Sequence, residues 1–391
     1  MIEKQNKPKI RFKDFTDAWQ EQKLADITVN LDGDRVPVTK NKRIAGPTPY
    51  YGANGIQDYV AGSTHTGNLI LIAEDGANSV CDYPINTITG KAWVNNHSHV
   101  LTDKPGISNY LFLGKRLKTI KIKPYLTGSD RLKLTNNELN KIMLKVPQFA
   151  EQEKLGDLFA TLDLLIANRQ RKYQKIQTLK RQLLQRLFPE TPTTPSLRFT
   201  AFSHNWVTKK LSEVATIKSG GTPRLTETQY WNGQIDWFTP TEVQNQGYLH
   251  HSLKTITRTG LNNSRAILLP KDTILMTSRA GIGKMGILSY PAATNQGFQS
   301  LIPSNQINPY FLYSMHDRIA RMANKLASGI TFTEISARET ANIKLIIPET
   351  TAEQAKIGDM LKQYDQFLSG IERELNQLKQ VRTAFMQLLF S

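Results

Sequence analysis

Apolar residues recur in two long stretches of the chain at alternating steps of four and three residues, which is the pattern of one helix face. The stretches run from 155 to 187 and from 357 to 389. At about 1.5 Å per residue, each predicts a helix roughly 50 Å long, which cannot bury its seam alone. One such seam often lies on its own domain, but two matching seams favour each other as partners. The predicted interface comprises Leu155, Phe159, Leu162, Ile166, Tyr173, Ile176, Leu183 and Leu187 with Ile357, Leu361, Tyr364, Leu368, Ile371, Leu375, Leu378, Phe385 and Leu389.

The two halves of the chain repeat each other at their ends but not in their middles. Arg11 and Trp19 are among six large residues that recur 187 positions later. The run 154–157, at the start of the first seam, recurs 202 positions later. The change of displacement means that the second middle is about 15 residues longer, and the two middles share almost no sequence. A frame is therefore duplicated around two unlike insertions.

Between the halves lies a segment with Pro189, Pro192, Pro195 and three threonines, which can neither stay helical nor build a core. This linker lets the second half turn back, so the helices are predicted to be antiparallel. The middles are rich in Gly, Asn, Thr, aromatic and β-branched residues, with short candidate strands such as 69–72 and 274–277. The prediction is an α+β protein with α/β domains at 1–150 and 191–350, separated by long helices at 151–190 and 351–391.

The overall charge narrows the choice of partner. Among 391 residues, 50 Lys and Arg outnumber 33 Asp and Glu, a net charge of +17 that favours a polyanion such as nucleic acid. A membrane surface is the competing interpretation, but the first residues are polar and interrupted by Pro8, and no apolar run approaches the roughly 20 residues of a span. The single cysteine, Cys81, excludes an internal disulfide and a cysteine zinc cluster. A cytoplasmic protein is expected.

Short runs in both middles then point to one family. The first middle contains the runs 50–56 (YYGANGI) and 72–77 (IAEDGA). The second contains 219–223 (SGGTP), 230–231 (YW), 237–240 (WFTP), 277–280 (TSRA), 294–298 (TNQGF) and 327–329 (ASG). In this order, and with two heptad helices, they resemble the specificity subunits of type I restriction-modification systems over essentially the whole chain.

The resemblance implies a DNA-binding subunit without catalytic activity or a cofactor of its own. Two target recognition domains would each read one half of a split, asymmetric double-stranded DNA site, and the helices would set the gap between the halves. Two methyltransferase subunits would dock and methylate adenines with S-adenosylmethionine. Two restriction subunits, driven by ATP with Mg, would join for cleavage. Because the middles differ from each other, the two half-sites are expected to differ as well.

Residues that read DNA should be basic, amide-bearing or aromatic and lie in the divergent middles, because phosphate contacts supply affinity and base-edge contacts supply specificity. In the first middle the candidates are Lys40, Lys42, Arg43, Tyr51, Asn54, Lys91, Asn95, Asn96 and Arg131. In the second they are Arg224, Tyr230, Trp231, Gln244, Ser278, Arg279, Lys284, Asn295, Gln296 and Thr331. For each one, the alternative is a solvated surface residue or a turn former.

Other motifs favour structural interpretations. The run 281–286 fits the Gly-x-Gly-x-x-Gly nucleotide pattern, but a strand-like run follows it where that motif needs a helix. Asn308 resembles the first residue of an amino-methyltransferase tetrapeptide, but a helix start with Pro309 in its first turn is favoured. His97 and His99 have no Cys or carboxylate at ligand spacing, so no metal site is predicted.

Two rival functions remain open. A DNA-modifying enzyme would need a cluster of acidic or nucleophilic side chains, and the pure chain would show turnover. A coiled-coil scaffold for acidic proteins would explain the helices and the charge, but not the two divergent middles.

Overall fold

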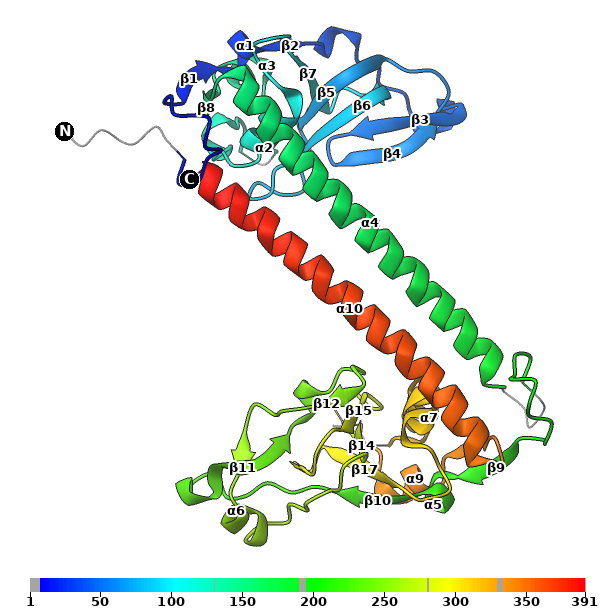
Figure 1. Cartoon of the computed structure of the whole chain (residues 1–391). Coiled ribbons are helices and arrows are strands. Elements are labelled where there is room, and N and C mark those ends of the chain that lie inside the picture. The colour runs from blue at the N-terminus through cyan, green and yellow to red at the C-terminus, as the bar shows by residue number, and fades with distance from the viewer. Residues whose placement is uncertain (1–7, 130, 190–194, 280, 329–332, 391) are drawn as a thin grey trace. The chain divides into compact units, whose positions relative to one another are not determined.

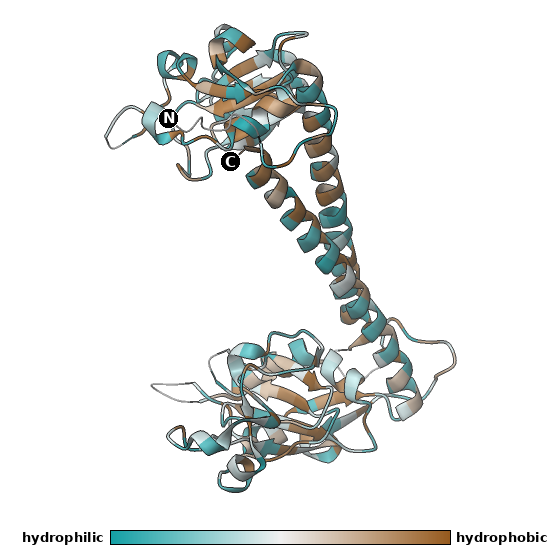
Figure 2. Cartoon of the chain, turned by 60° about the vertical axis from the view of Figure 1, so that its left-hand side comes forward, coloured by the Kyte–Doolittle hydropathy of each residue, from teal (hydrophilic) through white to brown (hydrophobic). Residues whose placement is uncertain are grey.

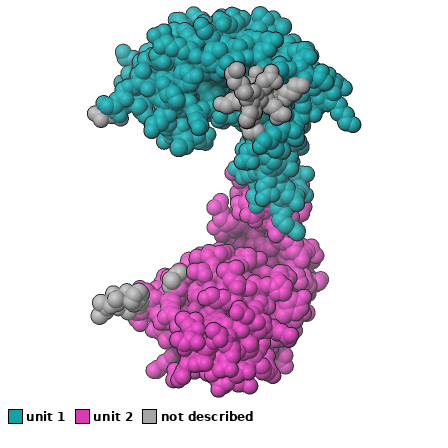
Figure 3. All heavy atoms as spheres, turned by 90° about the vertical axis from the view of Figure 1, so that its left-hand side faces the viewer, with its two compact units in different colours: residues 1–171, 373–391 teal, residues 172–372 magenta. Residues whose placement is uncertain are grey.

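The computed structural model of the chain describes residues 8–129, 131–189, 195–279, 281–328 and 333–390 (Figure 1). Its contacts divide the chain into two compact units, shown in different colours in Figure 3. Unit 1 comprises residues 1–171 and 373–391, and unit 2 comprises residues 172–372. Because each unit takes residues from both halves of the sequence, each contains part of both long helices.

Unit 1 is built on a six-stranded mixed sheet of order β2-β7-β5-β6-β3-β4, and β1 and β8 form a separate antiparallel pair. The strands are β1 (Gln20–Lys23), β2 (Thr28–Asn30), β3 (Ala45–Gly52), β4 (Gly55–Val60), β5 (His65–Ala73), β6 (Ile85–Val94), β7 (Ser98–Asp103) and β8 (Met143–Val146). The short helices are α1 (Leu24–Ile27), η1 (Asp32–Asp34), η2 (Lys40–Lys42), α2 (Tyr110–Leu117), η3 (Lys123–Tyr125) and α3 (Asn136–Asn140).

Unit 2 contains a five-stranded sheet of order β10-β17-β14-β15-β12, a three-stranded sheet of order β13-β11-β16, and the pair β18-β9. Its strands are β9 (Val207–Lys210), β10 (Ala215–Ser219), β11 (Trp231–Phe238), β12 (Tyr248–Leu249), β13 (Thr255–Ile256), β14 (Ile274–Thr277), β15 (Met285–Leu288), β16 (Ala293–Thr294), β17 (Phe298–Pro303) and β18 (Lys344–Ile347). Its short helices are α5 (Leu211–Val214), η4 (Thr228–Tyr230), η5 (Pro240–Glu242), α6 (Arg258–Asn262), α7 (Pro309–Ser314), α8 (His316–Leu326) and α9 (Ala337–Ala341).

Apolar strands and helix faces fill the interior of each unit, and Figure 2 shows their hydrophobic residues in brown. In unit 1 the ring of Trp19 contacts those of Phe112 and Phe390, with centroids 5.7 and 6.0 Å away. Aromatic side chains bury large apolar areas and dominate such cores. The sequence signal for this packing was therefore the repeated tryptophan, which predicted a duplicated structural frame.

Unit 2 repeats this arrangement. The ring of Trp206 lies 6.3 Å from that of Phe188 and 6.1 Å from that of Phe311. In each unit, the helix start before the central phenylalanine is capped by an asparagine: Asn109 accepts from the Phe112 amide and Asn308 from the Phe311 amide. The expectation that Pro309 begins a helix is thus confirmed.

The long helices are α4 (Phe149–Leu187) and α10 (Thr351–Phe390). Within each unit they lie side by side and run in opposite directions: Asp163 pairs with Arg382 in unit 1, and Lys180 with Asp365 in unit 2. The predicted antiparallel pair is confirmed. Lys180 and Arg382 are the polar residues that interrupt the two apolar seams, and the carboxylates of the opposite helix neutralise both.

All seventeen predicted seam residues are buried or half-buried. Their packing is more varied than a plain coiled coil, because the seam ends join the unit cores. Leu155, Phe159 and Leu162 belong to the core of unit 1, and Leu187 and Ile357 belong to that of unit 2. Both interpretations of the seam, a helix on its own domain and a helix against its twin, therefore hold along different parts of α4 and α10.

Candidate nucleic-acid interface

The two middles share one backbone feature that their sequences hide. In unit 1 the Asn95 amide donates to the Tyr51 carbonyl at 3.1 Å, and the Asn95 Oδ1 accepts from the His97 amide at 2.9 Å. In unit 2 the Asn295 amide donates to the Phe238 carbonyl at 3.1 Å, and its Oδ1 accepts from the Gly297 amide at 2.9 Å. Each asparagine follows the strand that pairs in parallel with β3 or β11.

The neighbouring segments match as well. The Glu74 amide donates to the His97 carbonyl, and the Ser278 amide donates to that of Gly297, both at 2.9 Å. Glu74 and Ser278 directly follow β5 and β14. We call the region formed by the Asn turn and the segment after β5 or β14 the variable edge of each unit. It is a common scaffold on which the two units place unlike side chains.

The side chains of the variable edge differ between the units. Asp75 in unit 1 corresponds to Arg279 in unit 2, and Asn96 corresponds to Gln296. Asn96 and Gln296 are exposed, and both can donate to and accept from base edges. The two units thus carry opposite hydrogen-bonding chemistry at one position, because the Asp75 carboxylate accepts hydrogen bonds while the Arg279 guanidinium donates them.

In unit 1 the structure brings Asn54, Asn96 and Arg131 to the variable edge. The Asn54 amide donates to the Gly76 carbonyl at 2.9 Å, and its Oδ1 accepts from the Asn78 amide, so this side chain ties the β3–β4 turn to the edge. Arg131 is exposed and pairs with Asp75 at 3.2 Å. The Arg131 guanidinium is therefore available to a polyanion only in competition with Asp75.

A network of charged side chains adjoins the variable edge of unit 1. The spacing of these residues in the sequence did not predict it. The His99 Nδ1 lies 2.6 Å from an Asp32 oxygen, and its Nε2 lies 2.7 Å from the Leu134 carbonyl. Arg35 and Lys133 both pair with Glu74, at 2.6 and 2.8 Å.

This network brings His99, Asp32 and Glu74 within metal-binding distance of one another. The absence of carboxylates at ligand spacing was thus a poor guide, because the fold brings in Asp32 from η1 and Glu74 from the segment directly after β5. Burial alone would raise the pKa of Glu74, but hydrogen bonds from Lys133 and Arg35 outweigh it and lower that pKa. Because Arg35 and Lys133 already neutralise the Glu74 carboxylate, we interpret this cluster as a structural support of the variable edge.

In unit 2 the structure joins Gln244 to Lys284, whose Nζ donates to the Gln244 Oε1 at 2.8 Å. The Gln296 Oε1 accepts from the Thr222 hydroxyl at 2.7 Å, which leaves the amide NH₂ of this exposed side chain free to donate. Arg279 is half-buried and makes no hydrogen bond or ion pair within the described ranges. It is therefore the cation of this edge with the most freedom to contact DNA.

The glycine run 281–286 belongs to this edge of unit 2 and not to a nucleotide site. Gly283 has a φ of +90°, and the run leads into strand β15 where a dinucleotide fold would begin a helix. The structure thus supports the interpretation of residues 281–284 as a loop, whereas Met285 and Gly286 already belong to β15.

The remaining predicted contacts lie apart from the variable edges. Lys40 and Lys42 are exposed on η2, and Lys91 is exposed on β6. Arg43 is held more firmly: its guanidinium pairs with Asp58 at 3.2 Å and lies 3.9 Å from the centre of the Tyr50 ring.

In unit 2, Arg224, Tyr230 and Trp231 form a group near β11. The Trp231 Nε1 donates to the Arg224 carbonyl at 3.1 Å, and the Trp231 ring packs edge-on against Trp237 at 5.1 Å. Tyr230 and Trp231 are half-buried, whereas Arg224 is exposed.

Three predicted DNA contacts need correction. Tyr51 and Asn95 are only 8% and 5% exposed, and Ser278 is fully buried. Asn95 shapes its turn, and the Ser278 hydroxyl donates to Glu334 at 2.9 Å. These side chains position the variable edges and are not available at the surface. Asn295 is half-buried and plays the same turn-forming role as Asn95, and Thr331 lies outside the described residues.

The duplicated frame, the two α/β units and the paired long helices define a class of proteins with two repeated domains and variable edges. The model of the type I restriction modification DNA specificity domain matches residues 16–178 and 203–380, so the chain belongs to this family. Among the residues that the structure describes, no helix is both long enough and apolar enough to span a membrane.

Individual relatives agree with this assignment. Over 146 residues the chain is 40% identical to a Haemophilus influenzae protein described as a candidate type I restriction enzyme specificity subunit, a match covering 37% of this chain and 38% of that protein. It is 29% identical over 181 residues to the type I restriction enzyme MjaIX specificity subunit of Methanocaldococcus jannaschii, covering 45% and 42%. These matches span about two fifths of each relative.

A solved structure extends the likeness in fold to the whole chain. The type I restriction-modification system S subunit from M. genitalium superimposes with a TM-score of 0.75, over 98% of this chain and 99% of that one, at 17% sequence identity. At this identity the comparison concerns the fold alone, and it supports the arrangement of helices and sheets described above.

Proposed function

We propose that the chain is the DNA-reading specificity subunit of a type I restriction-modification complex. Each unit reads one half of a split double-stranded DNA site through its variable edge. The observation that carries this proposal is the pair of matching turns at Asn95 and Asn295, which present different side chains from one backbone scaffold. The net charge of +17 supplies the attraction to phosphate that any such reader needs.

The long helices set the gap between the half-sites in this proposal. Helices α4 and α10 contain 39 and 40 residues, which corresponds to about 60 Å each. Removing one heptad from both helices preserves the seam and is expected to shorten the gap between methylated half-sites. An unchanged gap would contradict this part of the proposal.

Two methyltransferase subunits dock on these helices in this proposal. Four exposed apolar residues directly precede either a seam residue or one of the two cations that interrupt the seams, at places where a two-stranded coil usually carries charge. Leu165 (44% exposed) and Val381 (43%) lie in unit 1, and Leu179 (47%) and Phe367 (49%) lie in unit 2. Leu165 and Phe367 are 202 positions apart, as are Leu179 and Val381. The duplication thus gave each unit an equivalent pair of exposed apolar residues, one on α4 and one on α10, which fits two copies of one partner.

In this proposal the partner subunits carry out the methylation and restriction reactions. We propose that the methyltransferase subunits use S-adenosylmethionine, that restriction subunits use ATP and Mg, and that the chain works in the cytoplasm without catalytic activity. The alternative of a DNA-modifying enzyme is tested by incubating the pure chain with DNA, Mg and methyl donor, where turnover would support the alternative.

The direct test of DNA reading is selection of binding sites from a random duplex library by the complex assembled with its methyltransferase. The proposal predicts sites with two unlike half-sites at a fixed separation and with strongly salt-dependent affinity. Selection of no common sequence would contradict it, and would favour the scaffold alternative.

A further inference from the structure

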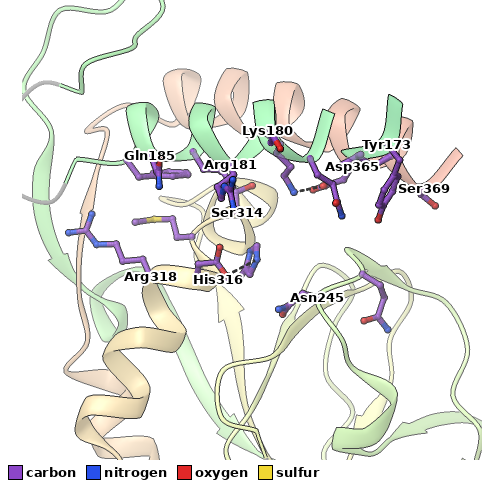
Figure 4. A pocket seen from close by; sticks show the side chains of 18 of the residues that line it. Tyr173, Lys180, Arg181, Gln185, Asn245, Ser314, His316, Arg318, Asp365 and Ser369 are labelled. Carbon is purple, nitrogen blue, oxygen red and sulfur yellow. Dashed lines mark hydrogen bonds and ion pairs between the residues drawn. The ribbon is translucent and has the colours of Figure 1, made fainter. Parts of the chain in front are cut away.

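The duplication also built two equivalent clefts, one in each unit. The cleft of unit 2, about 900 Å³, lies between α4, α10 and the segment around His316 (Figure 4). The cleft of unit 1, about 560 Å³, lies between α10 and the end of α2. Five residues of α10 line the unit 1 cleft, and each lies 202 positions after a residue that lines the unit 2 cleft; four of those residues are on α4, and the fifth directly follows its end. The five pairs are Lys180 and Arg382, Arg181 and Thr383, Leu184 and Met386, Gln185 and Gln387, and Phe188 and Phe390.

The first pair of the five is already neutralised inside the protein. Lys180 pairs with Asp365, which also accepts from the Tyr310 hydroxyl at 2.9 Å. Arg382 pairs with Asp163 at 3.0 Å, and Lys115 pairs with the same carboxylate. These cations hold the helices together and are not available to a ligand.

Other polar groups in the clefts have no such partner. Within the described ranges, the side chains of Arg181 and Lys118 make no hydrogen bond or ion pair, and the same holds for the side-chain amides of Gln185 and Gln387. All four are exposed. Figure 4 shows Arg181 and Gln185 on α4, on the side that faces Ser314 and Arg318. Each cleft therefore combines one unpaired cation with one unpaired amide.

The walls beside these groups are apolar. Leu184 and Phe188 line the cleft of unit 2, and Met386 and Phe390 line that of unit 1. A free cation can bind a carboxylate, a glutamine can pair with a peptide group, and an apolar wall can receive an apolar side chain. This combination matches an extended acidic peptide.

We propose that each cleft binds the same acidic peptide segment of a partner subunit that is present in two copies. The inference rests on the proposed function, which supplies such a partner in the methyltransferase subunit. DNA phosphate fits these clefts less well, because carboxylates such as Asp317 and Glu372 line the larger one and Asp82 lines the smaller one. A DNA backbone would bring a continuous row of charges against these carboxylates, whereas an acidic peptide can place one carboxylate beside Arg181 or Lys118 and neutral or apolar side chains along the rest of the cleft.

Photo-crosslinking tests the proposal directly. A p-benzoylphenylalanine is placed at position 185 or at position 387 of the full chain, and the complex with the methyltransferase is irradiated and digested. Both positions are expected to crosslink to one and the same acidic segment of the methyltransferase. Crosslinks to DNA, to a basic segment, or to two different segments would overturn the proposal.

Charge reversal gives a second, quantitative test. Arg181→Glu with Gln185→Glu alters the cleft of unit 2, and Lys118→Glu with Gln387→Glu alters that of unit 1. Each is expected to weaken the binding of one methyltransferase subunit at least tenfold, so that native mass spectrometry shows one bound copy in place of two. A matched control, Arg171→Glu with Gln174→Glu, makes the same charge change on exposed residues of α4 outside the clefts.

The controls distinguish a failure of the proposed function from a failure of the cleft inference alone. If the unaltered chain binds no methyltransferase, the proposed function itself fails. If the unaltered chain binds two copies and the variants with reversed cleft charges also bind two as tightly as the control, only the cleft inference fails.

Discussion

A buried ion pair in unit 2 provides the sharpest test of how the duplicated frame is held together. Arg198 and Glu353 lie at equivalent places to Arg11 and Glu151 in the repeat, and both carboxylates are almost fully buried. The Arg198 Nε and Nη2 donate to the two Glu353 oxygens at 2.7 and 2.8 Å. The Trp206 Nε1 also donates to Glu353, at 3.3 Å. This pair ties the start of the second half to helix α10.

Glu353→Ala leaves the guanidinium of Arg198, whose side chain is only 9% exposed, with the His204 carbonyl as an acceptor but without its carboxylate. Removing one member of a buried pair costs about 3–5 kcal/mol, a large part of the roughly 5–15 kcal/mol that stabilises a typical domain. The double variant Arg198→Met with Glu353→Met removes both charges, and such replacements are often neutral. The double variant is therefore expected to be more stable than the single one.

The assay is equilibrium unfolding in urea followed by tryptophan fluorescence, since Trp206 contacts the pair directly. Glu151→Ala is the matched variant in unit 1, where Arg11 donates to Glu151 at 2.6 and 2.8 Å. Glu151→Ala should lower the free energy of unfolding by a similar amount. A loss below about 1 kcal/mol for Glu353→Ala, or a double variant no more stable than the single one, would refute this reasoning.

Three further predictions follow from single sites. Arg279→Ala should relax the base preference in one half-site only, at a cost of about 1–3 kcal/mol in binding to the preferred DNA; loss of preference in both halves, measured by site selection, would contradict the assignment. Asp163→Asn should destabilise the protein by about 1 kcal/mol at pH 7 after allowance for solvent screening. Burial would raise the pKa of Asp163, but Lys115 and Arg382 lower it below its usual value, so the benefit exists above about pH 4. It is lost as the pH falls through the lowered pKa, and a difference in melting temperature that did not shrink as the pH fell below about 4 would contradict this cause. Gly283→Ala should cost about 2–3 kcal/mol in denaturant unfolding, because φ is +90° and the new Cβ would lie 2.5 Å from that of Ala320; an unchanged midpoint would exclude strain at this turn.

The duplicated parts of the fold could be predicted because large residues at fixed spacing have one physical explanation. The recurrence of Trp19 at position 206 predicted a duplicated frame, and the seams predicted the antiparallel helices α4 and α10. The shared backbone of the middles escaped prediction, because each turn combines one asparagine, a common turn former, with main-chain hydrogen bonds to segments remote in sequence.

The candidate contacts were harder to predict for a related reason. Asparagine and serine favour turns as well as base edges, and composition does not distinguish these roles. Asn95 and Ser278 were therefore assigned to DNA, although the structure uses them to shape the variable edges. The network around His99 shows the opposite error, since Asp32 and Glu74 are remote in sequence and meet only in the folded unit.

The central claim is that each unit reads its own half of one DNA site. It is tested most directly by replacing residues 200–345 with the corresponding segment of another family member, co-expressing the hybrid with the methyltransferase subunit, and mapping methylated adenines across the genome. The account predicts that one half-site changes while the other keeps its sequence. A change in both half-sites, or in neither, would contradict it.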